Sequence, residues 1–328
     1  MEETDAPPLV SVIIPAFQAA GTLGRALDSA LAQDYPALEV IVIDDGSTDN
    51  TRQVVAQYMA RDARVRYFWQ TNQGIGAARN LAVAHAQGEY LALLDADDEW
   101  RPGKLRLQAE VLRQQPAIGL VFSDSRHIDV VTGRSQLFFE LYAHALRQLR
   151  VEAVRPYPDV FRITGNARRA LYVSGLINAA TVMLRASLFR QAGGFATAWR
   201  GPEDLDMWLR VAKTSELAFC TRQFTVRYLQ ATSASRASDR FIKEMIAYYQ
   251  MCRRSPEYAD LAADARRRLS IQHRHLVFYY GRHQQPRLAW AAFRSSLADG
   301  FDGLGALCAL GAWLGPWPFR AAGRLLWP

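Results

Sequence analysis

The feature that most constrains the fold is a short apolar run that ends abruptly in three acidic residues. Residues 90–94 (YLALL) are followed directly by a segment that contains Asp95, Asp97 and Asp98. A run of this length, bounded by Gly88 and by charge, is typical of a buried strand in a parallel sheet. Carboxylates at the carboxyl end of such a strand lie where open α/β sheets bind their ligands.

These three carboxylates need a positive partner, because close acidic groups repel one another and lose hydration energy when they are buried. Hard oxygen ligands favour Mg²⁺ or Mn²⁺, so the segment predicts a divalent-metal site. The alternative is a solvated acidic loop that caps a helix starting near Glu99 and Pro102. Taken alone, an Asp-x-Asp pattern favours the capping loop. The rest of the chain favours the metal site instead.

Three units of a strand followed by a helix precede this run. Apolar, β-branched runs at residues 9–15, 38–43 and 64–69 are predicted to be strands, and each is followed by a helix-like pattern. Together with residues 90–94 they predict a doubly wound α/β fold with a mostly parallel sheet. The polar loops after these strands are then expected to gather at one edge of the sheet.

Two of these loops carry residues suited to a nucleotide. Asp44 and Asp45 precede a glycine turn, where a carboxylate could accept hydrogen bonds from a base or ribose, or could simply cap the next helix. Gly74 and Gly76 open the third helix and permit close approach of phosphate to its free N–H groups. Arg79 could reach a diphosphate in a fork geometry, although an ordinary surface arginine gives the same pattern.

A further acidic pair, Glu203 and Asp204, begins a helix-like pattern after a Gly-Pro dipeptide. Asp204 is interpreted either as a cap stabilised by the helix dipole or as a general base that takes a proton from a hydroxyl group. Residues 179–184 are expected to form a strand. Within residues 124–172, residues 129–135 suggest a turn between strands, residues 137–149 have helical spacing, and residues 150–172 are mixed, basic and rich in turn formers. We expect the whole segment to be an irregular insertion over the site.

The formal net charge of +7 is unevenly distributed. Residues 1–100 hold 6 arginines against 15 acidic residues, net −9, whereas residues 101–328 are net +16. No nucleic-acid motif accompanies the basic part, so an anionic substrate or an anionic membrane surface is the expected partner and nucleic acid is not. Three distant cysteines and an acidic start without signal-peptide character predict a cytoplasmic location.

The sequence pattern predicts that the last quarter of the chain is a separate region. A first domain is expected at residues 1–238 and a helical region at 239–328, with a helical hairpin around residues 279–293. The tryptophan-containing apolar segment 303–319 is too short to span a bilayer, so it is predicted to lie at a membrane surface or against the first domain. The first of these arrangements would place the protein on the inner face of the cell membrane.

Four segments, taken together, resemble the signatures of the family 2 glycosyltransferases, which have a GT-A fold. They are VSVIIPAFQAA (10–20), VIVIDDGSTDNT (40–51), NQGIGAARNLAVAHAQGEYLALLDADDEWRPGKL (72–105) and GGFATAWRGPEDLDMWLRVA (193–212). The resemblance covers roughly the first 215 residues, and its specificity lies in the joint pattern rather than in any single motif.

The resemblance implies a role for each matching residue. The expected nucleotide-sugar site consists of Pro15, Phe17, Asp45, Arg79, Asp95, Asp97 and Glu203. Within it, Asp45 would accept a hydrogen bond from the base, which is most often uracil in this family. Asp97 and Asp98 would hold Mn²⁺ or Mg²⁺ and contact the ribose, and Asp204 would be the catalytic base.

The implied function is inverting transfer of a single sugar from a nucleoside-diphosphate sugar, expected to be UDP-linked, to a hydroxyl acceptor. A glycan or lipid-linked acceptor in surface-polysaccharide or glycolipid synthesis is expected. A non-catalytic nucleotide-sugar binder and a sugar nucleotidyltransferase are the alternatives, although residues 15–22 lack the Lys or Arg that a triphosphate site would need.

The chain also departs from the family pattern at residues 227–235. Ser233 and Ser235 match, but Gln230 stands where many members carry a metal-binding histidine, so the metal preference stays open. The Gln-x-x-Arg-Trp signature of polymerising members is absent from the sequence, which favours single-sugar transfer over processive synthesis.

Overall fold

The computed structural model describes residues 6–230 and 238–299. The described chain separates into two compact units. One comprises the residues up to 199 together with 203–230, and the other comprises residues 200–202 and the helical residues 238–299. The expected boundary at residue 238 stays a prediction, and the segment 303–319 lies outside the described residues.

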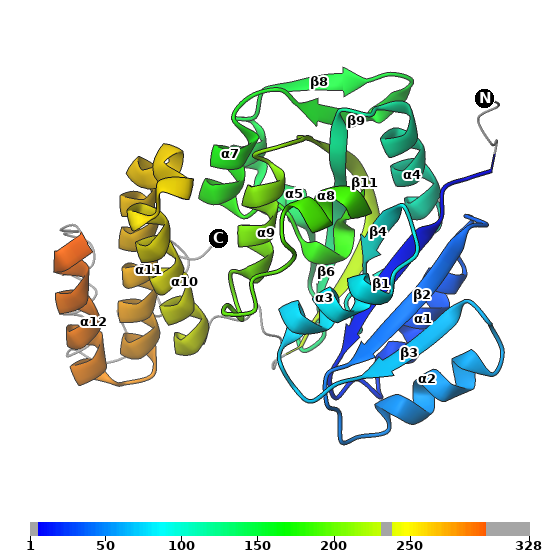
Figure 1. Ribbon diagram of the computed structural model, residues 1–328. Helices are drawn as coiled ribbons and strands as arrows, with labels where there is room; N and C mark the ends of the chain where they lie inside the picture. Colours follow the sequence, from blue (N-terminus) through cyan, green and yellow to red (C-terminus); the bar gives the residue numbers. More distant parts are fainter. Residues whose placement is uncertain (1–5, 231–237, 300–328) are drawn as a thin grey trace. The chain divides into compact units, whose positions relative to one another are not determined.

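The first unit is built on a mixed sheet, which in the described chain has 11 strands (Figure 1). Nine of them follow the order β3-β2-β1-β4-β10-β6-β11-β9-β8, and β5 pairs with β11 and β7 with β6 beside this path. The strands are β1 (Val10–Ala16), β2 (Leu38–Asp44), β3 (Val65–Trp69), β4 (Tyr90–Leu93), β5 (Glu99–Trp100), β6 (Ile118–Asp129), β7 (Ser135–Leu137), β8 (Val151–Val154), β9 (Tyr157–Ile163), β10 (Met183–Arg185) and β11 (Glu216–Leu229). Strands β1 to β4 pair in parallel, as do β6 and β11. The predicted doubly wound α/β fold is confirmed.

Helices cover both faces of this sheet (Figure 1). They are α1 (Leu23–Leu31), α2 (Thr51–Met59), α3 (Ile75–His85), α4 (Lys104–Gln114), α5 (Phe138–Leu141), α6 (Ala143–Leu146), α7 (Ala167–Ser174), α8 (Ala186–Gln191) and α9 (Glu203–Val211), with a 3-10 turn at Ala179–Thr181. Alternate strand residues such as Val12 and Val42 share one apolar core with Leu27 of α1 and Leu105 of α4. Each such fully buried side chain contributes about 2 kcal/mol.

Helix α3 lies on the other face of the sheet, because the connection from β3 to β4 runs across the sheet in the opposite direction to the two before it. The four predicted strands of this half occur within two residues of their expected positions. Their carboxyl ends therefore meet at one edge, as expected, with α3 starting from that edge.

The prediction of an irregular insertion at residues 124–172 is wrong, although the structure has the expected turn between strands at 129–135 and two short helices within 137–149. Strand β6 continues to Asp129 and turns into β7, and β9 and β8 extend the sheet beyond β11. The edge strand β8 has only four residues, three of them exposed, so no buried apolar alternation marks it in the sequence. The strand expected at residues 179–184 is shorter, because the Asn178 side chain accepts the Ala180 N–H and starts a 3-10 turn.

Strand β11 was not expected from the sequence, and its irregular register explains why. Between Cys220 and Thr225, five residue steps on β11 correspond to two on the neighbouring β6, from Ser123 to Ser125. This bulge interrupts the period-two pattern that identifies a strand. The strand beyond the bulge carries Arg227, which reaches the acidic loop after β4.

The second unit contains α10 (Asp239–Arg254), a 3-10 segment (Pro256–Leu261), α11 (Ala262–Arg282) and α12 (Pro286–Asp299). Ser238 caps α10 by accepting the Phe241 N–H, and α11 and α12 pack as the predicted helical hairpin (Figure 1). Among the described residues, no helix has the combination of length and apolar character that a membrane crossing requires.

Candidate functional site

The loops after β1 and β2 bring Pro15, Phe17 and Asp45 to the same edge of the sheet. Pro15 lies inside β1, buried and paired with Ile43, because the strand continues through Ala16. Phe17 is 53% exposed, and the Asp45 N–H donates to the Ala16 carbonyl at 2.8 Å. An exposed aromatic ring therefore stands beside the loop that holds Asp45.

The Asp45 carboxylate is buried and organises the loop that precedes α3. It accepts hydrogen bonds from the Gln70 side-chain amide at 2.6 Å and from the N–H groups of Gln73 and Gly74, each at 2.8 Å. Gly74 has a φ of 92°, a conformation that favours glycine. A carboxylate offers about four acceptor positions, so recognition of a base by Asp45 would use the one that remains.

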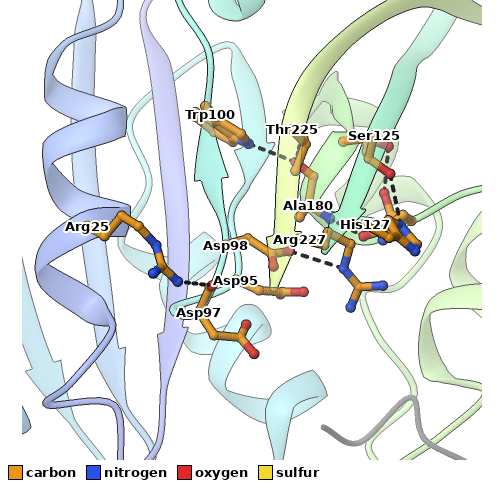
Figure 2. Close-up of polar contacts among 12 residues, drawn as sticks. Arg25, Asp95, Asp97, Asp98, Trp100, Ser125, His127, Ala180, Thr225 and Arg227 are labelled. Carbon is orange, nitrogen blue, oxygen red and sulfur yellow. Dashed lines mark hydrogen bonds and ion pairs between the residues drawn. The ribbon is translucent and has the colours of Figure 1, made fainter. Parts of the chain in front are cut away.

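The three acidic residues after β4 lie in different environments, as Figure 2 shows. The Asp95 carboxylate accepts from Arg79 at 2.8 Å, and that of Asp98 accepts from Arg227 at 3.2 Å. The Asp97 carboxylate makes neither a hydrogen bond nor an ion pair with another described side chain. The capping-loop alternative is wrong, because Asp98 is 1% exposed and α4 begins only after Gly103.

Negative charge is nevertheless concentrated in this loop. Burial raises the pKa of Asp98 well above its usual range, and the Arg227 guanidinium opposes that rise. Burial and the neighbouring Asp95 carboxylate raise the pKa of Asp97. An added cation would therefore be stabilised next to Asp97.

The residues present fit a divalent metal held mainly by a substrate. Mg²⁺ commonly uses one or two carboxylates together with substrate phosphates, and the uncommitted Asp97 carboxylate suits that arrangement. Asp98 suits it less well, because its buried carboxylate is already paired with Arg227. Within the described residues, no three His, Cys, Asp or Glu side chains converge into a complete metal-binding cluster.

Arg79 lies on α3 and is 2% exposed, so the surface-arginine alternative is wrong. Besides its hydrogen bond to Asp95, its Nη1 lies 3.7 Å from Glu203 Oε1. One buried guanidinium thus joins the acidic loop to the first residue of α9, 124 positions along the chain from Arg79. The expected contact of Arg79 with a nucleotide stays a prediction.

Glu203 and Asp204 form the first turn of α9, as predicted. Glu203 is 6% exposed, and burial together with the adjacent Asp204 raises its pKa to about 8. Burial also raises the pKa of Asp204, and Arg79 opposes that rise. A partly buried carboxylate with raised proton affinity is suited to accept a proton from a hydroxyl group.

A family model described as glycosyl transferase family 2 matches residues 11–187, which is more than half of the chain. The chain belongs to this family. The match includes Asp45, Arg79 and Asp97, and it ends before α9.

Curated relatives of this glycosyltransferase share parts of its length. EpsE of Bacillus subtilis, a putative glycosyltransferase, is 30% identical over 253 residues, 75% of this chain and 83% of that protein. An uncharacterised glycosyltransferase of Rickettsia conorii is 30% identical over 213 residues, 64% of this chain but 32% of that protein. Chondroitin synthase of Escherichia coli is 39% identical over 122 residues, 37% of this chain and 18% of that protein. The match thus spans a third or less of the last two relatives.

Solved structures with low sequence identity share the fold. Staphylococcus aureus TarS in complex with UDP-GlcNAc has a TM-score of 0.63 at 16% identity, over 97% of this chain and 92% of that one. The mannosyltransferase PcManGT of Pyrobaculum calidifontis, in complex with GDP-Man and Mn²⁺, has a TM-score of 0.57 at 21% identity, over 99% and 87%. The predicted GT-A fold is confirmed.

Two arginines of this glycosyltransferase that surround the acidic loop were missed in the sequence. Arg25 of α1 donates to the Asp97 carbonyl at 2.7 Å and lies 3.8 Å from the Tyr228 ring centre (Figure 2 shows the bond to Asp97). Arg227 pairs with Asp98 from β11. The β-branched and aromatic run at residues 224–226 could have revealed the strand, but not which acid Arg227 would meet. Gln230 follows this strand, whereas Ser233 and Ser235 lie outside the described residues.

His127 is a further buried group of the glycosyltransferase that the sequence did not single out. It faces Arg227 in the pairing of β6 with β11, and its Nε2 lies 3.1 Å from Ser125 Oγ (Figure 2). Burial, assisted by the Arg227 charge, lowers the pKa of His127 to about 3. The imidazole is therefore neutral in the folded protein at neutral pH.

Mild acid is expected to destabilise the protein through His127. Below about pH 6.5 the unfolded chain binds a proton on this imidazole whereas the folded chain does not, so stability rises with pH from about 3 to 6.5. At pH 5 the effect is about 2 kcal/mol. Urea unfolding at pH 5 and pH 7.5 measures how much stability is lost on acidification. This loss should be about 2 kcal/mol smaller in His127→Gln than in the wild type. The exposed His144→Gln should behave like the wild type; equal losses in all three proteins would contradict this account.

Proposed function

We propose that this family 2 glycosyltransferase transfers a single sugar, with inversion, from a nucleoside-diphosphate sugar to a hydroxyl acceptor. The observation that carries the proposal is the buried link from the Asp95 carboxylate through Arg79 to Glu203. It holds a loop suited to a metal diphosphate close to a carboxylate, Asp204, suited to proton abstraction. Such a pairing serves a displacement at a carbon that carries a phosphate leaving group.

The proposed donor is UDP-linked, and the proposed acceptor is a glycan or a lipid-linked sugar. The TarS structure with UDP-GlcNAc supports a uridine donor, and the PcManGT structure with GDP-Man keeps a guanosine donor as a comparison. The names of the relatives, which include a chondroitin synthase and a putative teichuronic acid glycosyltransferase, support a polysaccharide acceptor. Peripheral placement on the inner face of the cell membrane stays a prediction.

The chemistry assigned to the residues is a single displacement. Asp204 takes the proton of the acceptor hydroxyl, and the oxygen attacks the anomeric carbon from the face opposite the leaving diphosphate. The new carbon–oxygen bond forms as the bond to the phosphate oxygen breaks, so the configuration inverts without a covalent enzyme intermediate. Asp97 would hold Mn²⁺ or Mg²⁺, which, when bound, neutralises charge on the leaving diphosphate. Phe17 and Asp45 would bind the base, and Asp204 would keep the proton until the product leaves.

Donor binding should raise the melting temperature in a metal-dependent manner. A panel of UDP-GlcNAc, GDP-mannose and dTDP-glucose, each with and without Mn²⁺, tests the proposal. A ligand at 100 times its Kd stabilises by about 2.7 kcal/mol, which is a shift of roughly 5 °C in a protein of this size. We expect such a shift for one base in the presence of Mn²⁺ and its loss in Asp97→Ala.

The outcome that contradicts the proposal is a panel without any shift, or a Mn²⁺-dependent shift that Asp97→Ala leaves intact. The nucleotide released identifies the reaction class: a transferase releases UDP or GDP from its donor, whereas a sugar nucleotidyltransferase forms pyrophosphate from a triphosphate. The exposed Glu89, at the opposite end of β4, provides a matched control as Glu89→Ala.

A further inference from the structure

An ion-paired unit of Arg79, Asp95 and Glu203 joins the acidic loop after β4 to the start of α9. The reaction requires these two segments to keep a fixed relative position. We propose that Arg79 is a positioning residue, whose guanidinium fixes the start of α9, and therefore Asp204, relative to the acidic loop after β4. The inference rests on the proposed function, since it assigns Asp204 the role of base. This positioning role is an alternative to the predicted contact between Arg79 and the nucleotide.

The burial and the charge of this guanidinium favour a structural role. The side chains of Arg79, Glu203 and Asp95 are 3%, 8% and 17% exposed, respectively. A buried guanidinium always keeps its charge, so it requires a nearby carboxylate, and Asp95 supplies one at 2.8 Å. The guanidinium charge also favours the ionised form of Glu203, whose pKa burial and Asp204 raise to about 8, so the pair with Glu203 is fully charged only above that pH. The planar fork engages one carboxylate with Nη2 and the other with Nη1, a geometry that a lysine ammonium cannot reproduce.

Neighbouring residues of α3 hold the same region from the same helix face. The Asn80 side chain donates to the Phe195 carbonyl and accepts the Phe195 N–H, both at 2.8 Å. The Phe195 ring centre lies 5.2 Å from Arg79 Cζ. A side chain at Gly76 would come within 3.7 Å of Glu203 Cγ. Positions 79 and 80 lie three and four residues after position 76, about one turn away, so α3 presents a continuous surface to Phe195 and Glu203.

The same geometry argues against direct contact between Arg79 and a diphosphate. Its Nε and Nη1 make no hydrogen bond to a described residue, yet both atoms are buried. Nη1 faces Glu203, and the Phe195 ring lies against the guanidinium. A diphosphate would reach these atoms only after displacing Glu203 or Phe195.

Kinetics separate positioning from donor binding. The test measures UDP or GDP release from UDP-GlcNAc and GDP-mannose, with water as the acceptor, in Arg79→Met, Arg79→Lys and Glu203→Gln. Because a displacement of about 1 Å lowers rates about 100-fold, we expect kcat to fall by that factor in Arg79→Met while the donor KM changes less than about threefold. Arg79→Lys should recover part of kcat, and the exposed Arg113→Met should match the wild type.

A stability cycle tests the ion-paired unit without reference to activity. The change in unfolding free energy is measured at pH 9, above the pKa of about 8 of Glu203, for Arg79→Met, Glu203→Gln and the double variant. Coupled groups give a double variant that loses clearly less stability than the sum of the two single losses. Glu203→Gln keeps the side-chain volume, so it reports on the unit even where Arg79→Met does not fold.

Two results would overturn the positioning role: additive losses in the cycle, or a donor KM raised about 100-fold with kcat unchanged, which is the signature of lost uniform binding. A wild-type protein that releases no nucleotide from either donor, with the coupling present, would instead count against the proposed function.

Discussion

Replacing Asp204 with asparagine is expected to lower turnover by about 10³-fold while the donor still binds. General-base catalysis contributes about 10²- to 10⁴-fold, and asparagine keeps the shape of the side chain but cannot accept the proton. The measurement is the rate of UDP or GDP release at a saturating donor concentration, together with the donor-induced shift of the melting temperature. The Glu89→Gln variant is the control, because this exposed acid lies at the far end of β4.

The pH dependence of the Asp204 reaction has a definite sign. Burial raises the pKa of Asp204, so the rate in the wild type should rise with pH through a limb that lies above the usual aspartate range. That limb should disappear in Asp204→Asn. Unchanged turnover in the variant would identify the base elsewhere, and a wild type that binds donor without any turnover would favour the non-catalytic binder.

Replacing Arg227 with methionine is expected to destabilise the fold by about 3 kcal/mol. Removal of one partner from a buried pair leaves the other charge uncompensated, and the Asp98 side chain is only 2% exposed. Chemical unfolding at pH 8 measures the loss. Arg222→Met is a matched control on the same strand: its ion pair with Asp159 is exposed, and exposed pairs contribute about 0 to 1 kcal/mol.

The loss in Arg227→Met should shrink in mild acid. Burial raises the pKa of Asp98 above its value in the unfolded chain, so the folded variant binds a proton more readily, and its stability falls as pH rises above about 4. The destabilisation should be larger at pH 8 than at pH 5, and the double variant with Asp98→Asn should recover part of it. Equal losses in Arg227→Met and Arg222→Met would show that the Asp98 pair is not the cause.

The parallel half of the sheet could be predicted because its physical signals are local. Strands β1, β2 and β4 are buried on both faces, and each helix has one apolar stripe, so runs and periods in the sequence identify them directly. The positions of Asp45 and Asp97 at strand ends follow from that regularity alone. The metal and nucleotide roles came from the resemblance and stay predictions.

The remainder could not be predicted because its signals are non-local. No sequence pattern near Arg79 indicates that Glu203 is its partner. The charge of Arg79 likewise gives no indication that the side chain is buried. The edge strand β8 is short and mostly exposed, and its neighbour β9 lacks the regular alternation of a half-buried strand. The environment of Asp98 depends on β11, a strand whose pattern is broken at its centre.

The bulge in β11 also restricts how this protein can change during evolution. Five residue steps on β11 against two on β6 mean three additional residues, an odd number, between Cys220 and Thr225. Because side chains alternate between the two faces of a strand, losing or gaining one residue there would turn Arg227 away from Asp98. Substitutions can accumulate along this strand, but single-residue insertions and deletions would remove a buried charge partner at once. The number of residues in the bulge is therefore more constrained than the identity of those residues.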